Sequence, residues 1–216
     1  MGNLKWRMRL RELAMAQKCL LEYGQKIVFL GDSITQAEPG YVSGVQSIIG
    51  ALIPDLKLEY VNAGIGGHKV TDMLDRIGEH VIALDPDWVT VSVGINDVWH
   101  GHAGVPIDQF RPKYDELVDR LKKQTVAKLA LFTTTVIGED LDNEANAKLV
   151  EYNDHIRSVA AKGNHLLVEM NEVFHDAIKR WHSIGTDLRF TTDGVHMSPI
   201  GNYLMADTLA KAWGVL

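Results

Sequence analysis

The chain has 216 residues, of which 46% are hydrophobic and 23% charged, a balance that fits one globular domain and excludes disordered or collagen-like classes. Its 28 acidic and 22 basic residues give a net charge of −6, which argues against a nucleic-acid partner because phosphate binding needs clustered positive charge. No apolar run approaches the roughly 20 residues of a membrane span and no secretory signal is visible, so we expect a soluble, cytoplasmic protein.

Residues 1–24 form a basic segment at the start of the chain. Five basic and two acidic residues give this segment a charge of +3, which leaves −9 for the remainder. A helix through the segment would carry four apolar side chains on one face: Trp6, Leu10, Leu13 and Leu20. We therefore expect an amphipathic N-terminal helix packed outside a single domain of residues 25–216. The alternatives are a subunit contact, which would make the protein a homo-oligomer, and a helix lying on a membrane surface.

Short apolar runs alternate with helical patterns from residue 26 onward. The runs, each as long as a buried strand, are residues 26–30, 58–61, 88–93, 129–132 and 166–169. Apolar side chains at helical spacing lie at residues 41–52, 70–81, 110–121 and 149–159, and a last helix begins near Pro199. This alternation predicts an α/β fold in which a mostly parallel, five-stranded sheet is covered by helices on both faces.

Polar or glycine-rich segments follow three of the predicted strands, and a fourth precedes the last helix. They are GDSIT at residues 31–35, NAGIGG at 62–67, GIND at 94–97 and DGVH at 193–196. In parallel sheets, functional groups gather beyond the carboxyl ends of the strands. We therefore expect these segments to lie close together.

Their residue types suit acyl transfer by a serine nucleophile. A serine hydroxyl needs a base to remove its proton, and Ser33 would be served by His196, with Asp193 three residues away to orient the imidazole. Donors for the negative charge on the attacked carbonyl oxygen would be the amides of Ser33 and of a glycine within 64–67, with the side chain of Asn96. Glycine is needed there because a side chain would block the approach of the backbone to the substrate.

Each segment has an ordinary structural interpretation when it is taken alone. GDS forms common turns, paired glycines occur in tight connections, and an asparagine or an aspartate–histidine pair is frequent in loops. The four segments together, each at a strand end or before the closing helix, favour catalysis over coincidence.

The same four segments resemble the blocks of the SGNH (GDSL-type) hydrolase superfamily, and the likeness extends over nearly all of residues 25–213. It implies a three-layer α/β/α sandwich with a flavodoxin-like sheet. It also implies that Ser33 is the nucleophile, that His196 is the general base and then acid, and that Asp193 orients it. The oxyanion hole would comprise Ser33, Gly67 and Asn96, with Gly67 at the position of the glycine in the second block of the family.

Residues 86–99, PDWVTVSVGINDVW, resemble bacterial carbohydrate acetylesterases of the acetylxylan-esterase type. This likeness implies a serine esterase that hydrolyses short acyl esters, foremost O-acetyl groups of a glycan or small molecule, through an acyl-serine intermediate. One alternative is a lysophospholipase- or thioesterase-like acylhydrolase with a longer acyl substrate. Another is a non-catalytic domain that binds a sugar or a partner. We expect Asp32, Trp99 and Val195 to contact the substrate.

No cofactor is implied by these residues. The pair His100 and His102 could suggest a metal site, but ligands at suitable spacing are few, and we expect these histidines to lie on the rim of the site. The sequence contains neither a GxGxxG fingerprint nor a Walker A loop, so it lacks the phosphate cradle of nucleotide-binding proteins.

Overall fold

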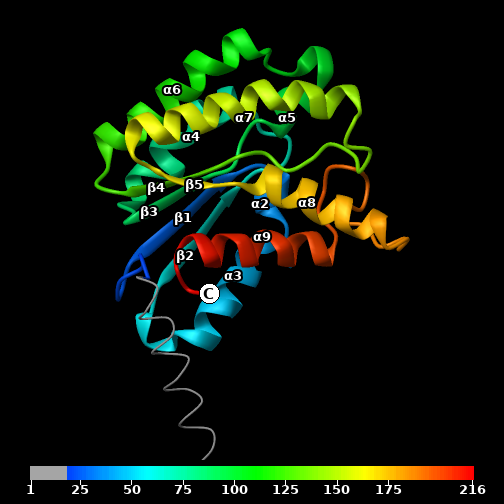
Figure 1. The fold of residues 1–216 in the computed structure, drawn as a ribbon. Helices are drawn as coiled ribbons and strands as arrows, with labels where there is room; N and C mark the ends of the chain where they lie inside the picture. Colours follow the sequence, from blue (N-terminus) through cyan, green and yellow to red (C-terminus); the bar gives the residue numbers. More distant parts are fainter. Residues whose placement is uncertain (1–18) are drawn as a thin grey trace, which may run out of the picture.

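The computed structural model describes residues 19–216 as a parallel β-sheet between two layers of helices (Figure 1). The strands are β1 (Lys26–Gly31), β2 (Glu59–Gly64), β3 (Trp88–Val91), β4 (Lys128–Phe132) and β5 (Leu166–Val168). They lie in the order β2-β1-β3-β4-β5, and all neighbouring strands are parallel. This is the flavodoxin-like order, so the predicted three-layer α/β/α fold is confirmed.

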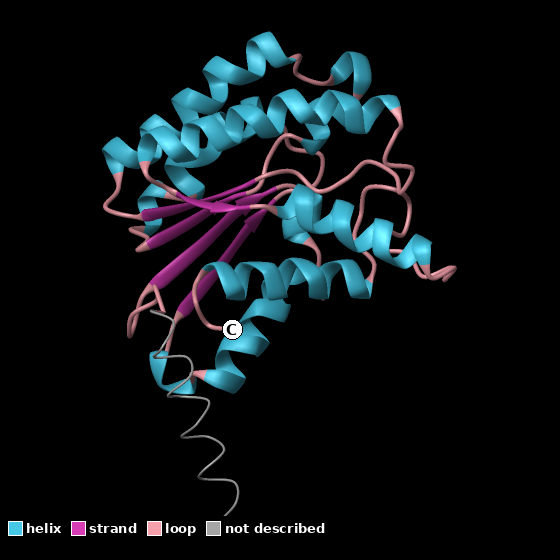
Figure 2. Cartoon of the chain, in the orientation of Figure 1, coloured by secondary structure: helices cyan, strands magenta, loops and turns pink. Residues whose placement is uncertain are grey.

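Six longer helices cover the two faces of the sheet (Figure 2). One layer contains α3 (Tyr41–Leu52), α8 (Met170–Ser183) and α9 (Pro199–Ala212), and the other contains α4 (Val70–His80), α6 (Ile107–Gln124) and α7 (Glu144–Gly163). The shorter helices are α2 (Ser33–Gln36), α5 (Ile95–Trp99), η1 (Pro54–Leu56), η2 (Ile82–Leu84) and η3 (Gly101–Ala103).

Each strand contributes to two separate cores because successive side chains point to opposite faces of a sheet. In β1, Ile27 and Phe29 pack in the core beneath α3, α8 and α9. Val28 and Leu30 pack in the core beneath α4, α6 and α7. All four side chains are fully buried, and this two-sided burial explains why the strand is a continuous apolar run.

Strand β2 and helix α8 differ most from the sequence-based expectations, and β3 ends at Val91 rather than at residue 93. Strand β2 continues to Gly64 rather than ending near residue 61. Backbone pairing with β1 extends as far as Gly31 and Gly64, and it does not require the apolar side chains on which the prediction was based. Helix α8 was not predicted. Its buried residues Met170, Phe174 and Ile178 recur every fourth position, which is the spacing of a helix that buries one face.

The segment that precedes β1 is only partly described. Most of the predicted N-terminal helix, residues 1–18, lies outside the described residues. Residues 19–24 are not helical, which corrects that part of the prediction. The amide of Leu20 donates to the carbonyl of Trp213 instead of to its own segment, and the Leu21 side chain is buried in the core.

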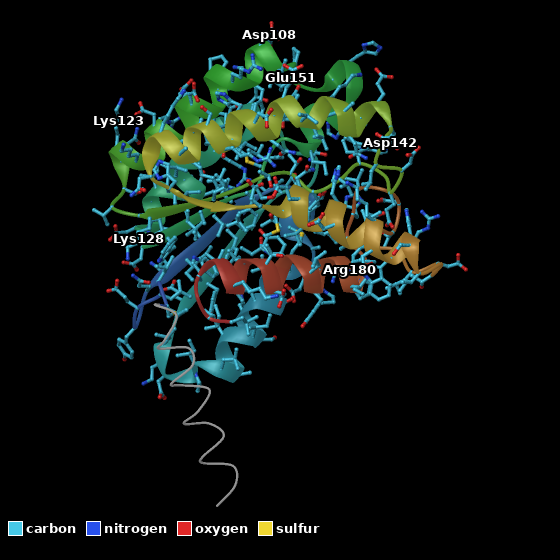
Figure 3. All side chains as sticks on the ribbon, viewed as in Figure 1. Asp108, Lys123, Lys128, Asp142, Glu151 and Arg180 are labelled. Carbon is cyan, nitrogen blue, oxygen red and sulfur yellow. The ribbon has the colours of Figure 1, made fainter. Side chains whose placement is uncertain are left out.

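Exposed charged side chains cover the outside of the layers, among them the six labelled in Figure 3: Asp108, Lys123, Lys128, Asp142, Glu151 and Arg180. Between residues 19 and 216, none of the helices has the length and apolar character to cross a membrane.

Substitution in the core beneath α6 tests this packing. Leu117 is fully buried, so Leu117→Ala should lower the free energy of unfolding by about 2–5 kcal/mol through lost contacts and a cavity. Val126 is 86% exposed, and Val126→Ala should change this free energy by less than about 0.5 kcal/mol. Urea denaturation measures both variants. Equal losses for the two would contradict the assignment of Leu117 to the core.

Candidate active site

The carboxyl ends of β1, β2 and β3 meet at one edge of the sheet. Because β1 lies between β2 and β3, the connections that follow β1 and β3 leave the sheet on opposite sides. In open α/β sheets, the crevice at such a point is where ligands bind. Helix α2 begins just after β1 and helix α5 begins shortly after β3, so both short helices start at this crevice.

Ser33 is the first residue of α2, in the turn that follows β1. The turn is fixed by Asp32, whose Oδ1 accepts a hydrogen bond from the amide of Ile34 (2.9 Å) and whose carbonyl accepts one from Gln36 (2.9 Å). The Ser33 side chain is partly exposed, whereas Asp32 is 1% exposed. The buried aspartate therefore holds the turn that presents the serine.

The loop after β2 is joined closely to α2. A methyl group on Gly64 would overlap the backbone nitrogen of Gln36, so only glycine allows this approach. Asn62 donates from Nδ2 to the carbonyl of Thr35 (2.7 Å) and accepts from the amide of Gly64 (2.9 Å). Gln36 in turn accepts from the amide of Gly66 (2.8 Å). These contacts fix the second predicted segment beside the serine.

His196 and Asp193 complete a chain of hydrogen bonds with the serine. The Nε2 atom of His196 lies 3.0 Å from Ser33 Oγ, and its Nδ1 atom lies 2.6 Å from Asp193 Oδ2. The other carboxylate oxygen, Oδ1, accepts from the amides of Val195 (3.0 Å) and His196 (2.8 Å). The hydrogen bonds from His196 and Val195 lower the pKa of Asp193 to about 2. The Asp193 carboxylate is therefore ionised at neutral pH.

Contacts from the loop after β4 support the segment that carries this pair. Glu139 is buried, and its Oε1 atom accepts from both the amide and the hydroxyl of Thr191 (2.8 Å each). The amide of Gly138 donates to the carbonyl of Gly194 (2.6 Å). Sequence reasoning missed Glu139, because an acidic residue in a loop carries no signal until its burial is known.

Three donors in the segments around Ser33 have no acceptor among the described residues or keep a free hydrogen. Within the described part of the chain, no hydrogen bond uses the backbone amide of Ser33 or of Gly67, although the amides of residues 64–66 are all paired. Gly67 has φ +76°, a conformation that favours glycine. Asn96 donates from Nδ2 to the carbonyl of His68 (3.1 Å), which leaves its second amide hydrogen for a ligand.

Two carboxyl groups next to the catalytic residues, those of Asp32 and Asp97, are buried. Burial raises the pKa of Asp32 to about 6 and that of Asp97 to about 7. Asp97 Oδ1 accepts from the amide of Val70 (3.1 Å), at the start of α4, whereas Oδ2 has no hydrogen-bond partner among the described residues. Asp97 thus connects α5, which carries Asn96, to the helix that follows the glycine loop.

Of the three residues predicted to contact the substrate, only one has an exposed side chain. Trp99 is 51% exposed, as a substrate contact requires. Asp32 and Val195 are 1% and 2% exposed, so their side chains face the interior and do not fit the predicted role. His102 lies in η3 and His100 directly before it, and between residues 19 and 216 no three potential metal ligands gather.

The geometry suits nucleophilic attack on a carbonyl. His196 is hydrogen-bonded to Ser33 and to Asp193, and the segments around the serine keep unpaired donors of the kind that stabilise a tetrahedral oxyanion.

Comparisons with known proteins point to one family. Residues 29–204 match the model of the GDSL-like Lipase/Acylhydrolase family. The acetylxylan esterase of Geobacillus stearothermophilus is 29% identical over 212 residues, which cover 88% of this chain and 94% of that protein. A multidomain esterase of Ruminococcus flavefaciens is 25% identical over 176 residues, which cover 73% of this chain and 21% of that protein.

Solved structures show the same similarity. The crystal structure of the Geobacillus acetylxylan esterase superposes with a TM-score of 0.81 at 28% identity, covering 90% of this chain and 96% of that one. An α/β hydrolase from the metagenome of Lake Arreo, Spain, gives a TM-score of 0.84 at 27% identity, covering 92% and 99%. Catalytic mutants of the Geobacillus enzyme, in which a serine, an aspartate or a histidine is replaced by alanine, have also been solved.

The raised pKa values of Asp32 and Asp97 predict how stability depends on pH. Between about pH 4 and pH 7 the folded chain binds more protons at these groups than the unfolded chain, so their contribution to stability falls as pH rises. Asp97→Asn keeps an acceptor for Val70 but removes one titrating group. Its free energy of unfolding, measured in urea across this range, should fall less steeply than that of the wild type. Asp142→Asn, at an exposed carboxylate, is the control, and a slope unchanged in Asp97→Asn would contradict the prediction.

Proposed function

The chain belongs to the GDSL-like lipase/acylhydrolase family, and from this premise we propose that it is a serine esterase that removes short acyl groups, foremost acetyl groups, from the hydroxyls of a carbohydrate. The observation that carries the proposal is the chain of hydrogen bonds from Ser33 through His196 to Asp193, with distances of 3.0 and 2.6 Å.

Acylation begins at Ser33. Asp193 accepts a hydrogen bond from the Nδ1–H group of His196, which leaves the unprotonated Nε2 to take the proton of the serine hydroxyl. Ser33 Oγ then attacks the ester carbonyl carbon and a tetrahedral intermediate forms. The amides of Ser33 and Gly67 and the side-chain amide of Asn96 donate to its oxyanion. His196 passes the proton to the departing alcohol, and the acyl group remains on the serine.

Deacylation repeats these steps with water. His196 takes a proton from a water molecule, whose oxygen attacks the acyl carbon, and the same donors stabilise the second oxyanion. Collapse of this intermediate returns the proton to Ser33 Oγ and releases the acid. The residues of the chain thus provide the nucleophile, the base and the electrostatic stabilisation for both halves of the reaction.

The choice of a glycan ester is supported by the exposure of the site. The side chains of His196 and Asp193 are 49% and 55% exposed, so an ester on a bulky sugar can reach the serine. Trp99 lies three residues after Asn96 on α5, which places the two side chains on neighbouring positions of one helix face. A half-exposed indole there offers an apolar plate to the face of a sugar ring.

The Geobacillus acetylxylan esterase supports the assigned roles. The aspartate and the histidine replaced in its catalytic mutants lie three residues apart, which is also the spacing of Asp193 and His196. A serine is the third residue replaced in those mutants.

Hydrolysis of p-nitrophenyl acetate and p-nitrophenyl octanoate tests the proposal. The wild type should prefer acetate, and Ser33→Ala should lower kcat by about 10⁴-fold or more because the nucleophile is lost. Ser47→Ala, at an exposed serine on α3, is the control and should retain full activity. A preference for octanoate would replace the short-acyl substrate with a longer one. Near-normal activity of Ser33→Ala would overturn the mechanism.

Trp99 should matter for sugars and not for small esters. Loss of stacking in Trp99→Ala should raise KM for an acetylated xylooligosaccharide roughly two- to tenfold, equivalent to about 0.5–1.5 kcal/mol, and leave p-nitrophenyl acetate turnover unchanged. Tyr23→Ala is a matched control, because Tyr23 is 70% exposed and precedes the amino end of β1, opposite the site. An equal KM for wild type and Trp99→Ala would remove Trp99 from the sugar site.

A further inference from the structure

Arg76, on α4, makes hydrogen bonds to three separate segments around the active site. Its Nη2 atom donates to the carbonyl of Gly31 (2.9 Å) and its Nη1 atom to the carbonyl of Ala63 (2.8 Å). Its Nε atom donates to Nδ1 of His68 (3.0 Å). The guanidinium is half-buried, and the geometry of its donors matches these three acceptors at the same time.

These segments carry two of the donors of the oxyanion hole, Ser33 and Gly67. Gly31 ends β1 two residues before Ser33, and Ala63 is in β2, four residues before Gly67. The third contact, with His68, is adjacent to Gly67 in sequence. The carbonyl of His68 also accepts the hydrogen bond from Asn96, so the side chain of Arg76 is connected to the third donor as well.

The contact with Arg76 also determines the protonation of His68. An arginine side chain can only donate hydrogen bonds, so His68 Nδ1 must be an acceptor and the neutral ring carries its proton on Nε2. Burial and the charge of Arg76 both lower the pKa of His68, in agreement with a neutral ring. Its orientation, and with it the backbone next to Gly67, is therefore fixed by the guanidinium.

We propose that Arg76 is a positioning residue that fixes the relative positions of the three oxyanion donors, which belong to Ser33, Gly67 and Asn96. This role rests on the proposed esterase function. Lysine could not replace it, because an ammonium group is a single point donor and cannot reach two carbonyls and a ring nitrogen in fixed directions. Arg76 does not touch the reacting atoms and acts through the backbone that presents them.

The test compares Arg76→Lys with Arg120→Lys. Arg120 lies on α6 and donates from Nη1 to a single carbonyl, that of Leu74 (3.0 Å), so it is a matched arginine away from the donors. With p-nitrophenyl acetate, Arg76→Lys should lower kcat by about 10²-fold with KM changed less than about twofold, because misplaced donors weaken only the transition state. Arg120→Lys should retain the wild-type kcat. The fraction of active enzyme in each sample is measured by complete reaction of Ser33 with a fluorophosphonate.

A double-mutant cycle with Asn96→Ala distinguishes positioning from a general loss of structure. If Arg76 acts through the oxyanion hole, Arg76→Lys should lower kcat by less than about tenfold in the Asn96→Ala background, well below its effect in the wild type. Arg76→Gln, which keeps an amide donor, is the second variant if Arg76→Lys does not fold, and the same outcome is expected of it.

Three results separate the possible failures. Wild-type kcat in Arg76→Lys would overturn the positioning role and leave the esterase assignment intact. An equal loss of kcat in both backgrounds would overturn it as well, because the effect would then be independent of the donors. Full activity of Ser33→Ala in the same assay would instead overturn the proposed function.

Discussion

The hydrogen bond between Ser33 Oγ and His196 Nε2 joins residues that lie 163 positions apart in the chain, and the rest of the site depends on it. A distance of 3.0 Å requires that both segments be held independently. Ser33 is held by the turn after β1, which Asp32 caps. His196 is held by Asp193, and the segment that carries both residues is held by the contact of Glu139 with Thr191. The parallel sheet makes this meeting feasible, because it brings the carboxyl ends of its strands to one edge.

The position of the oxyanion donors depends on the close approach of two backbone segments, the end of β2 and helix α2. Helix α2 contacts the end of β2 so closely that Gly64 cannot carry a side chain, and Asn62 and Gln36 bridge the remaining polar groups. The arrangement leaves the amides of Ser33 and Gly67 without acceptors among the described residues. Donors of this kind are oriented before the substrate arrives, so no reorganisation is needed when the oxyanion forms.

Much of this arrangement could be predicted from the sequence, and the missing parts share a physical cause. The alternation of apolar runs and helical patterns indicated the sheet and most helices, because these patterns are local. The roles of Glu139 and Arg76 could not be read in the same way, since each depends on burial and on hydrogen-bond partners distant in sequence. Asp32 and Val195 belong to the correct motifs, but motif membership does not reveal that their side chains face inward.

The rate of covalent labelling tests whether His196 activates Ser33, without reference to any natural substrate. A fluorophosphonate should attach once per chain, peptide mapping should place it on Ser33, and His196→Gln should slow the labelling by at least about 10²-fold because the general base is lost. Attachment to a different residue, or an unchanged rate in His196→Gln, would contradict the activation of Ser33 by His196.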